Sequence, residues 1–513
     1  MTRGHLFVVD ADLTKIAADA WYLPVDHDFN VTDHWVAIAE RLDPLHSTRG
    51  PWAKDELARF LGYDDRSAVW WGDVGRDGSD IVHYSRCALQ FIAKATERHR
   101  QDHPSSSRRP VLAMPHLGTG RGGAKWSHGD LLKNLISAIT DQMNTGDIDA
   151  DVILVSFGPT SEAAAQRVRY GEHDSWRDDP QWQFEFDQDR LHAKAVELAT
   201  LLRHDRAAIF MGAGVSIGAG LPGWISVLES VGADTKPPTT IEELRALTDP
   251  RDMANLLQRR LAKEGGSLAR LLSTKLSTSK YSLQHGLIAS LPCNEFITTN
   301  VDELFEQAAT ATTGTIKVVP NQSESDRWLL KLHGTIADEA SLVFTRDNFL
   351  DLGRGSRALF GLVQAMLFTK HMLFVGYGLG DEDFHEVVYD VRSAFPNKML
   401  DRRIGTALIP KDDPIKRELW DDTLDIVSMR PTDQDVGEAA RDLERFMDLV
   451  GMLSSDRSAF LLEKQFDGML SDSERGLRDS LDELLAEARL HTDDDSAWRD
   501  VRQLLRRLGA RLR

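Results

Sequence analysis

An apolar segment that runs straight into a glycine-rich turn is the most informative part of this chain. The two stretches read Ala207-Ala-Ile-Phe-Met211 and Gly212-Ala213-Gly214-Val-Ser216-Ile-Gly218-Ala-Gly220-Leu-Pro222. A short apolar run bounded by glycines is typical of a buried strand. Glycines after such a strand let backbone N–H groups approach a phosphate, and the N-terminus of a following helix adds a favourable dipole. Alone, the turn also fits a tight connection, so the interpretation depends on partners further along the chain.

Three further polar or glycine-rich turns follow apolar segments. They read Thr298-Thr299-Asn300-Val-Asp302, Lys331-Leu-His333-Gly334 and Phe374-Val-Gly376-Tyr-Gly378-Leu-Gly380-Asp381. Strand-like segments recur, with helical stretches between them, at Glu295–Thr299, Leu329–Leu332, Met372–Val375 and Thr406–Ile409. This alternation predicts an α/β fold with a Rossmann-like, doubly wound parallel sheet. Because the carboxyl ends of parallel strands line the ligand crevice of such sheets, we expect the turns to face one ligand.

In this order and spacing the motifs resemble the sirtuin superfamily, from about residue 195 to about residue 430. The resemblance implies that the crevice binds NAD, with the glycine turn at the phosphates and the Gly376 turn near the adenosine. The cofactor-binding residues that it implies are Gly212, Ala213, Gly214, Ser216, Pro222, Thr299, Gly376 and Gly378.

The same resemblance implies that Asn300, Asp302 and His333 are catalytic. Departure of nicotinamide builds positive charge on the ribose C1′, and oriented polar groups such as Asn300 and Asp302 suit that charge. A histidine can take up a proton at neutral pH, so His333 is the expected general base. Each residue also has a structural interpretation, since Asn300 or Asp302 fits a helix N-cap and His333 fits a turn. Their occurrence together with the glycine turn favours the catalytic interpretation.

Two departures from the sirtuin pattern argue against protein deacylation. Deacylating sirtuins typically carry a four-cysteine zinc module after the Leu-His-Gly motif, whereas this chain has no cysteine after Cys293. The stretch Leu221-Pro222-Gly223-Trp224 also lacks the acidic, aromatic and arginine residues of the family's turn. Both departures are usual in divergent bacterial sirtuin-like domains that act as anti-phage effectors by hydrolysing NAD.

The expected activity is therefore that of a metal-free NAD+ glycohydrolase that releases nicotinamide and ADP-ribose, with a linear or cyclic product left open. The alternatives are an NAD or ADP-ribose sensor without catalysis, and a zinc-less protein deacylase or ADP-ribosyltransferase. A hydrolase of this kind must be held inactive, so we expect a trigger: a phage-derived or co-encoded protein, or a nucleotide signal.

Residues 1–160 read as a separate α/β domain. Its expected strands are Leu6–Val9, Ala20–Val25, Val111–Met114 and Val152–Phe157. Two motifs resemble macrodomains, which bind ADP-ribose: Val8-Val-Asp10-Ala-Asp12-Leu-Thr14 and Met114-Pro-His116-Leu-Gly118-Thr-Gly120-Arg-Gly122-Gly123. The Asn-rich segment of that family is replaced by Val25-Asp26-His27-Asp28. The glycine-rich loop at 118–123 is suited to a phosphate, so a ligand sensor and a scaffold are both open.

The rest of the chain is assigned as a linker at 161–190, the sirtuin-like catalytic domain at 191–432 and a helical C-terminal region at 433–513. In that last region Ser471-Asp-Ser-Glu474 has the form of a capping box. Its final helix carries an apolar stripe that fits either the protein's own core or a subunit contact, which makes a homo-oligomer the expectation: Trp498, Val501, Leu505, Leu508 and Leu512.

Bulk composition limits the partners and the location. The 61 Lys and Arg residues against 80 Asp and Glu give a net charge of −19, which disfavours nucleic acid and anionic membranes as partners. Cys87 and Cys293 are too few for a disulfide framework. No run approaches the ~18 apolar residues of a membrane span. We therefore expect a cytoplasmic protein.

Overall fold

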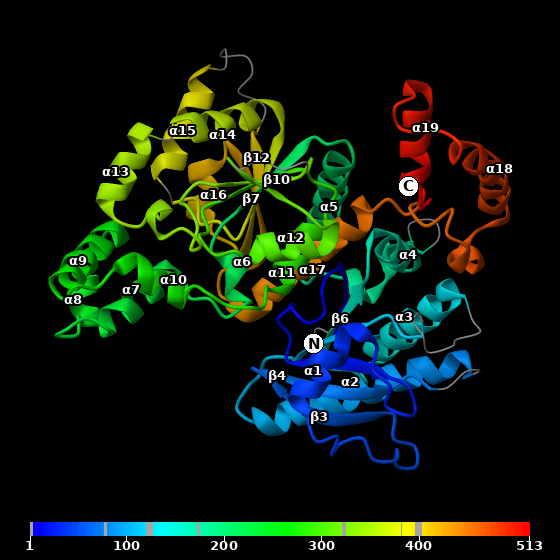
Figure 1. Cartoon of the computed structure of the whole chain (residues 1–513). Coiled ribbons are helices and arrows are strands. Elements are labelled where there is room, and N and C mark those ends of the chain that lie inside the picture. The colour runs from blue at the N-terminus through cyan, green and yellow to red at the C-terminus, as the bar shows by residue number, and fades with distance from the viewer. Residues whose placement is uncertain are drawn as a thin grey trace. The chain divides into compact units, whose positions relative to one another are not determined.

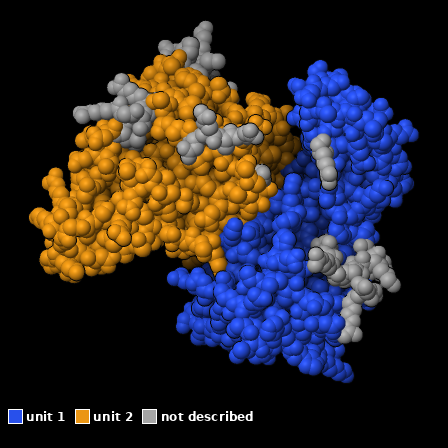
Figure 2. Space-filling view, in the orientation of Figure 1, with its two compact units in different colours: residues 1–183, 455–513 blue, residues 184–454 orange. Residues whose placement is uncertain are grey.

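The computed structural model describes residues 4–75, 79–118, 127–171, 175–320, 325–355, 357–380, 382–394 and 403–512. The chain divides into two compact units (Figures 1 and 2). Unit 1 combines residues 1–183 with residues 455–513, and unit 2 consists of residues 184–454. Among the described residues, no helix has both the length and the apolar character that crossing a membrane requires.

Unit 2 is built on a seven-stranded sheet in which every pairing is parallel. The strand order is β13-β12-β11-β7-β8-β10-β9. The bounds are β7 Ala207–Met211, β8 Glu295–Thr298, β9 Lys317–Val319, β10 Trp328–Lys331, β11 His371–Val375, β12 Gly405–Lys411 and β13 Leu424–Arg430. The predicted doubly wound parallel sheet is thus confirmed.

Strand β7 lies at the centre of this sheet. All five of its residues are buried, as a strand covered by helices on both faces requires. The chain leaves β7 towards β8 on one side, and it returns to pair β11 on the other side. The strand order therefore reverses between β7 and β11, where an open α/β sheet forms its crevice.

Helices cover both faces of the unit 2 sheet (Figure 1). One face carries α14 (Arg357–Thr369), α15 (Glu382–Ala394) and α16 (Pro414–Trp420). The other carries α5 (Gln188–Arg203), α11 (Leu283–Ser290), α12 (Leu304–Thr313) and α17 (Val436–Ser454). This double cover explains why the strands read as continuous apolar runs rather than as alternating ones.

Between β7 and β8 the chain inserts a helical layer with a core of its own. After the single turn α6 (Gly214–Ile217), it consists of α7 (Trp224–Ala233), α8 (Ile241–Arg245), α9 (Pro250–Lys263) and α10 (Leu268–Lys275). Its buried leucines and valines pack with Val301, Leu342 and Phe344, which follow β8 and the short η3 turn (Glu339–Ser341). Helix α13 (Arg346–Gly355) then leads back to the sheet. The helical layer therefore covers the carboxyl ends of β8 and β10.

Unit 1 holds a six-stranded sheet with the order β1-β6-β5-β2-β4-β3, parallel except for β3. The strands are β1 Leu6–Asp10, β2 Ala20–Val25, β3 Ala58–Asp64, β4 Ser67–Asp73, β5 Val111–Pro115 and β6 Asp151–Ser156. The helices of this segment are α1 Asp33–Leu42, α2 Ile81–Asp102, α3 His128–Thr145 and α4 Pro159–Tyr170. Four strands match the expected segments, whereas the hairpin of β3 and β4 was not anticipated.

The C-terminal segment completes the core of unit 1. It contains η4 (Lys464–Met469), α18 (Asp472–Ala488) and α19 (Ser496–Arg507). Phe460, Phe466, Leu485 and Leu505 belong to the same buried cluster as the residues of the six-stranded sheet. The apolar stripe of the last helix packs on this cluster, as one of its two interpretations expected.

The two units divide the chain differently from the assignment made on sequence. Helix α17 packs on α5 within unit 2, and the segment after Ser454 belongs to unit 1. The stretch assigned as a linker contains most of α4 and two 3-10 turns, η1 (Ser175–Asp178) and η2 (Pro180–Trp182). Trp176 and Trp182 in these turns are each only 1% exposed, so this segment is held against unit 1.

The macrodomain-like motifs fall at the carboxyl edge of the unit 1 sheet. Asp10 ends β1, and its carboxylate accepts a hydrogen bond from Gly158 N at 2.9 Å. The carboxylate of Asp12 accepts from the backbone and the hydroxyl of Thr14. Most of the glycine-rich loop at 118–123 lies outside the described residues, and the macrodomain likeness stays a prediction.

Candidate active site

Unit 2 contains a cavity of about 650 Å³ at the carboxyl ends of β7, β8, β10 and β11, bounded by the helical layer. Most of the residues singled out in the sequence line it: Ala213, Ser216, Pro222, Thr299, Asn300, Asp302, His333, Gly376 and Gly378. Its volume falls within the ~300–1,000 Å³ of ordinary small-molecule sites. The four motifs therefore meet at one cavity.

Gly212 and Gly214 lie behind the lining of the cavity and join two strand ends. Gly212 N donates to Val375 O at 3.0 Å, and Gly214 N donates to Gly376 O at 2.9 Å. A Cβ atom on Gly212 would lie 2.6 Å from Gly376 O, and one on Gly214 would lie 2.7 Å from Gly376 Cα. Both glycines are thus needed for the β7 and β11 turns to pack together. Their predicted contact with phosphates stays a prediction, and the four-residue α6 offers only a small helix dipole.

A chain of hydrogen bonds joins Asn300, Ser216 and Asp302. Asn300 Nδ2 donates to Gly212 O and to Ser216 Oγ, each at 3.1 Å. Ser216 Oγ in turn donates to Asp302 Oδ2 at 2.8 Å. Both amide protons of Asn300 therefore have partners within the protein, so its oxygen is the part that can accept from a ligand. The hydroxyl of Ser216 belongs to the Asn300–Asp302 network, and the expected contact of Ser216 with the phosphates stays a prediction.

The loop after β8, which carries Asn300 and Asp302, is held by contacts with α12 and with Lys331. Asp302 Oδ1 accepts from Leu304 N, the first residue of α12, at 3.1 Å, whereas the N-cap position itself belongs to Glu303. The buried ammonium of Lys331 donates to the carbonyl of Asp302 and to the Glu306 carboxylate. Burial raises the pKa of Glu306, and the neighbouring Lys331 opposes that rise. Asp302 thus serves both the helix and the cavity, with one oxygen for each.

His333 is 4% exposed and lines the same cavity. Its carbonyl accepts from Val343 N at 3.1 Å, and the next residue, Gly334, has a φ of +80°. A Cβ atom on Gly334 would lie 2.1 Å from Ser341 O, so only glycine fits this turn. The His333 ring meets Phe349 edge-on with 5.1 Å between centroids.

An ion-paired group at the cavity was missed by the motifs. Arg251 donates to Asp249 through Nε and Nη2, and its Nη1 donates to Glu382 Oε2 at 2.8 Å. All three residues line the cavity. Asp249 precedes a proline and caps α9. This pattern predicts the start of a helix and does not indicate a ligand-binding site. Their place at the cavity depends on how the helical layer folds over the sheet.

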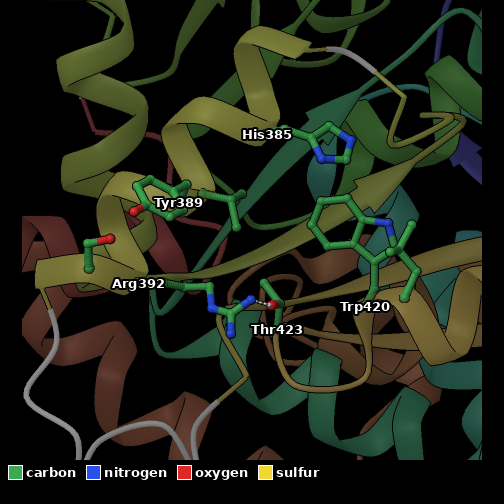
Figure 3. Close-up of a pocket in the computed structure, with 8 residues that line it drawn as sticks. His385, Tyr389, Arg392, Trp420 and Thr423 are labelled. Atoms are coloured by element: carbon green, nitrogen blue, oxygen red, sulfur yellow. Dashed lines mark hydrogen bonds between the residues drawn. The ribbon is translucent and has the colours of Figure 1, made fainter.

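Unit 2 has a second hollow of about 620 Å³, between α15 and α16 (Figure 3). Its arginine, Arg392, already donates to Thr423 Oγ1 at 3.0 Å and to the Asp422 carboxylate. His385 Nε2 lies 2.9 Å from the carbonyl of Leu379. None of the residues singled out in the sequence lines this hollow. The predicted chemistry therefore belongs to the first cavity.

In the described part of the chain, no group of three or more His, Cys, Asp or Glu side chains is arranged to hold a metal ion.

Comparison with known proteins bears on this cavity. A family model described as "SIR2-like domain" matches residues 294–429, from β8 almost to the end of β13. The NAD(+) hydrolase ThsA of Enterococcus faecium is 30% identical over 202 residues, which cover 36% of this chain and 40% of that protein. NAD(+) hydrolase ThsA of Cytobacillus dafuensis is 27% identical over 206 residues (38% and 40%), and that of Bacillus cereus (strain MSX-D12) is 26% identical over 226 residues (42% and 45%). This chain thus spans less than half the length of these relatives.

Proposed function

We propose that the SIR2-like domain carried by this chain hydrolyses NAD at the bond between nicotinamide and ribose. The observation that carries the proposal is the hydrogen-bonded set of Ser216, Asn300 and Asp302, which faces the same cavity as His333. The sirtuin resemblance is confirmed for residues 294–429, which contain the Asn300, His333 and Gly376 motifs; the glycine turn at 212–222 precedes the matched range. The relatives' names, NAD(+) hydrolase, support the proposed activity and support NAD as the substrate.

Hydrolysis breaks the C1′–N bond, and its electron pair leaves with the nicotinamide ring. Positive charge grows on the ribose until a water oxygen bonds to C1′. In this proposal the Asp302 carboxylate, held by Ser216 and Leu304, supplies a fixed negative charge near that centre. The Asn300 oxygen accepts a hydrogen bond from the ribose or from the water, because its amide protons are already engaged.

The attacking water must lose a proton, and His333 is the residue that takes it in this proposal. The ring is nearly buried, borders the cavity and packs edge-on against Phe349. General base catalysis of this kind contributes about 10²- to 10⁴-fold in rate. Asp302 is a less suitable base, because both of its oxygens already accept hydrogen bonds.

The test is direct measurement of nicotinamide release from NAD by the purified chain and by two variants. Asn300→Ala and His333→Ala should each lower kcat by about 10²-fold or more. His204→Ala, which removes an exposed histidine of the same unit, is the matched control and should leave the rate unchanged. If the resting chain is silent, lysate from phage-infected cells is added.

Other outcomes would favour the alternatives. NAD that binds without nicotinamide release under any condition would favour a sensor. Turnover that depends on acyl-lysine would favour a deacylase, and transfer of ADP-ribose to protein would favour a transferase.

We further propose that this activity serves anti-phage defence through NAD depletion. Assembly into a homo-oligomer and release by a phage-derived protein, a co-encoded protein or a nucleotide signal remain predictions from the sequence. Loss of infection-dependent NAD depletion in cells that carry His333→Ala would support the defence role, and unchanged depletion would contradict it.

A further inference from the structure

The cavity is poor in positive charge. Among the described residues that line it, Arg251 is the one lysine or arginine, and it stands beside three carboxylates: Asp249, Asp302 and Glu382. The pyrophosphate of NAD carries two negative charges, which such a lining repels unless a cation faces them. The four strand-end motifs contribute no lysine or arginine to the lining.

Arg251 is held unequally by its two carboxylate partners. Asp249 receives hydrogen bonds from Nε and Nη2 and is 22% exposed, so it fixes the base of the guanidinium. Nη1 instead donates to Glu382, whose side chain is 75% exposed. Ion pairs with so exposed a partner contribute little to stability. The Nε edge of the guanidinium is therefore held by Asp249, whereas Nη1 can exchange Glu382 for another anion.

The position of Arg251 suits the middle of the NAD molecule. Its guanidinium lies over the Phe349 ring at 5.6 Å, and the same ring contacts the His333 imidazole at 5.1 Å. One aromatic ring thus separates Arg251 from the expected base. In NAD, one ribose separates the pyrophosphate from the bond that breaks.

We infer that Arg251 binds the pyrophosphate of NAD, and that Glu382 occupies the same edge of its guanidinium until the substrate arrives. This inference rests on the proposed function and adds a substrate-binding residue from the helical layer to the strand-end motifs. Arginine is well suited to the task, because its planar fork donates two parallel hydrogen bonds to phosphate oxygens. Glu382 is thus an internal competitor, and its removal should strengthen substrate binding.

The experiment measures KM and kcat for nicotinamide release from NAD. Arg251→Gln should raise KM by roughly 10- to 100-fold with a smaller change in kcat, as loss of a charged hydrogen bond to substrate predicts. Glu382→Gln should lower KM by about two- to fivefold, since a weak exposed pair no longer competes. Arg251→Lys, which keeps the charge and loses the fork, should fall between wild type and Arg251→Gln.

Arg346→Gln is the matched control, because Arg346 donates to the same Asp249 carboxylate and does not line the cavity. If Arg251 only braces the helical layer, Arg346→Gln should raise KM to a similar extent, and that result would overturn the inference. An unchanged KM in Arg251→Gln would also overturn it.

A truncated substrate separates phosphate binding from a general loss of structure. Nicotinamide riboside has the same scissile bond and no phosphate, so Arg251→Gln should leave its kcat/KM within about twofold of wild type. An equal loss with both substrates would contradict the inference.

Failure of the proposed hydrolysis can be told apart from failure of this inference. If wild type releases no nicotinamide, calorimetric binding of NAD replaces the kinetic assay. Arg251→Gln should then still raise the Kd for NAD by roughly 10- to 100-fold, and an unchanged Kd would overturn the role of Arg251.

Discussion

Gly376 joins the two central turns of unit 2 through its backbone alone. Its φ is +64°, and a Cβ atom there would lie 2.6 Å from Val215 N. Gly378, two residues further along the same turn, has open space around the corresponding point. Two glycines of one motif therefore have different requirements, which their spacing in the sequence does not reveal.

Gly376→Ala should lower the free energy of unfolding of unit 2 by about 1–3 kcal/mol or more, because both the backbone angle and the packing oppose a side chain. Gly378→Ala is the control and should change it by less than about 0.5 kcal/mol. Denaturant unfolding of the two variants measures the difference. Equal stability of the two would show that the turn can rearrange.

Sequence motifs anticipate only some of the residues at the cavity. Asn300, Asp302 and His333 follow strands, so the rule for parallel sheets brings them together. Arg251 enters the cavity from a helix of the inserted layer, and no periodic pattern says over which strand end that layer folds. The glycine-rich motif of Ser216 indicates phosphate binding and does not reveal the hydrogen bond that its hydroxyl donates to Asp302.

Helix α11 begins at Leu283 with a capping box. The third residue of the helix, which is usually glutamate in such a box, is the buried His285. Ser282 Oγ accepts from His285 N, and His285 Nδ1 accepts from Ser282 N at 3.2 Å. Burial lowers the pKa of His285 to about 4, and the nearby Asp302 only partly opposes this. The cap therefore depends on the neutral imidazole.

Stability should consequently depend on pH through His285. Its folded pKa lies below the ~6.5 of an unfolded histidine, so between these values the unfolded chain binds a proton that the folded one does not. The contribution is complete above pH ~6.5 and is lost as the pH falls towards 4, by up to about 1.4 kcal/mol per unit.

Free energies of unfolding of wild type and His285→Gln, measured from pH 7 to pH 4, provide the test. From pH 7 to pH 4, the free energy of unfolding of wild type should fall by about 2–3 kcal/mol more than that of His285→Gln. Parallel pH profiles would contradict the assignment.

At the level of elements, the interior strands of the unit 2 sheet were predicted, whereas its two edge strands and the β3–β4 hairpin of unit 1 were not. β7, β8, β10, β11 and β12 all coincide with expected segments, because burial on both faces leaves a continuous apolar run. The three-residue β9 and the edge strand β13 lie at the two margins of the sheet and were missed. Pattern alone is weakest there, since an edge strand has only one partner to specify it.

Unit 1 is assembled from two segments that are separated by the whole of unit 2, as the single colour of both segments in Figure 2 shows. Phe466 is 2% exposed in the shared core, with its ring 5.6 Å from that of Phe460. The sequence predicted a separate helical C-terminal region. Periodicity identifies the apolar face of a helix, but it does not identify the part of the chain that packs against that face. The covering partner of η4 is helix α3, more than 300 residues earlier in the chain.

Phe466→Ala should therefore destabilise unit 1 by about 3–5 kcal/mol and leave unit 2 unaffected. Hydrogen exchange, followed by mass spectrometry, should show faster exchange in β1, β5 and β6 and unchanged exchange in β7 and β11. Val436→Ala, at an exposed position of α17, is a control that should alter neither pattern. Faster exchange in β7 would show that the two cores are not independent.

The split composition of unit 1 has a consequence for synthesis on the ribosome. Domains generally fold as units while the chain emerges. Every residue of unit 2 has been translated by codon 454, whereas the segment 455–513 that completes the core of unit 1 has not yet been translated. Unit 2 can therefore reach its native state on a nascent chain whose first-made segment is still incomplete, and a transcript cut short after that codon would encode the candidate active site together with an incomplete unit 1.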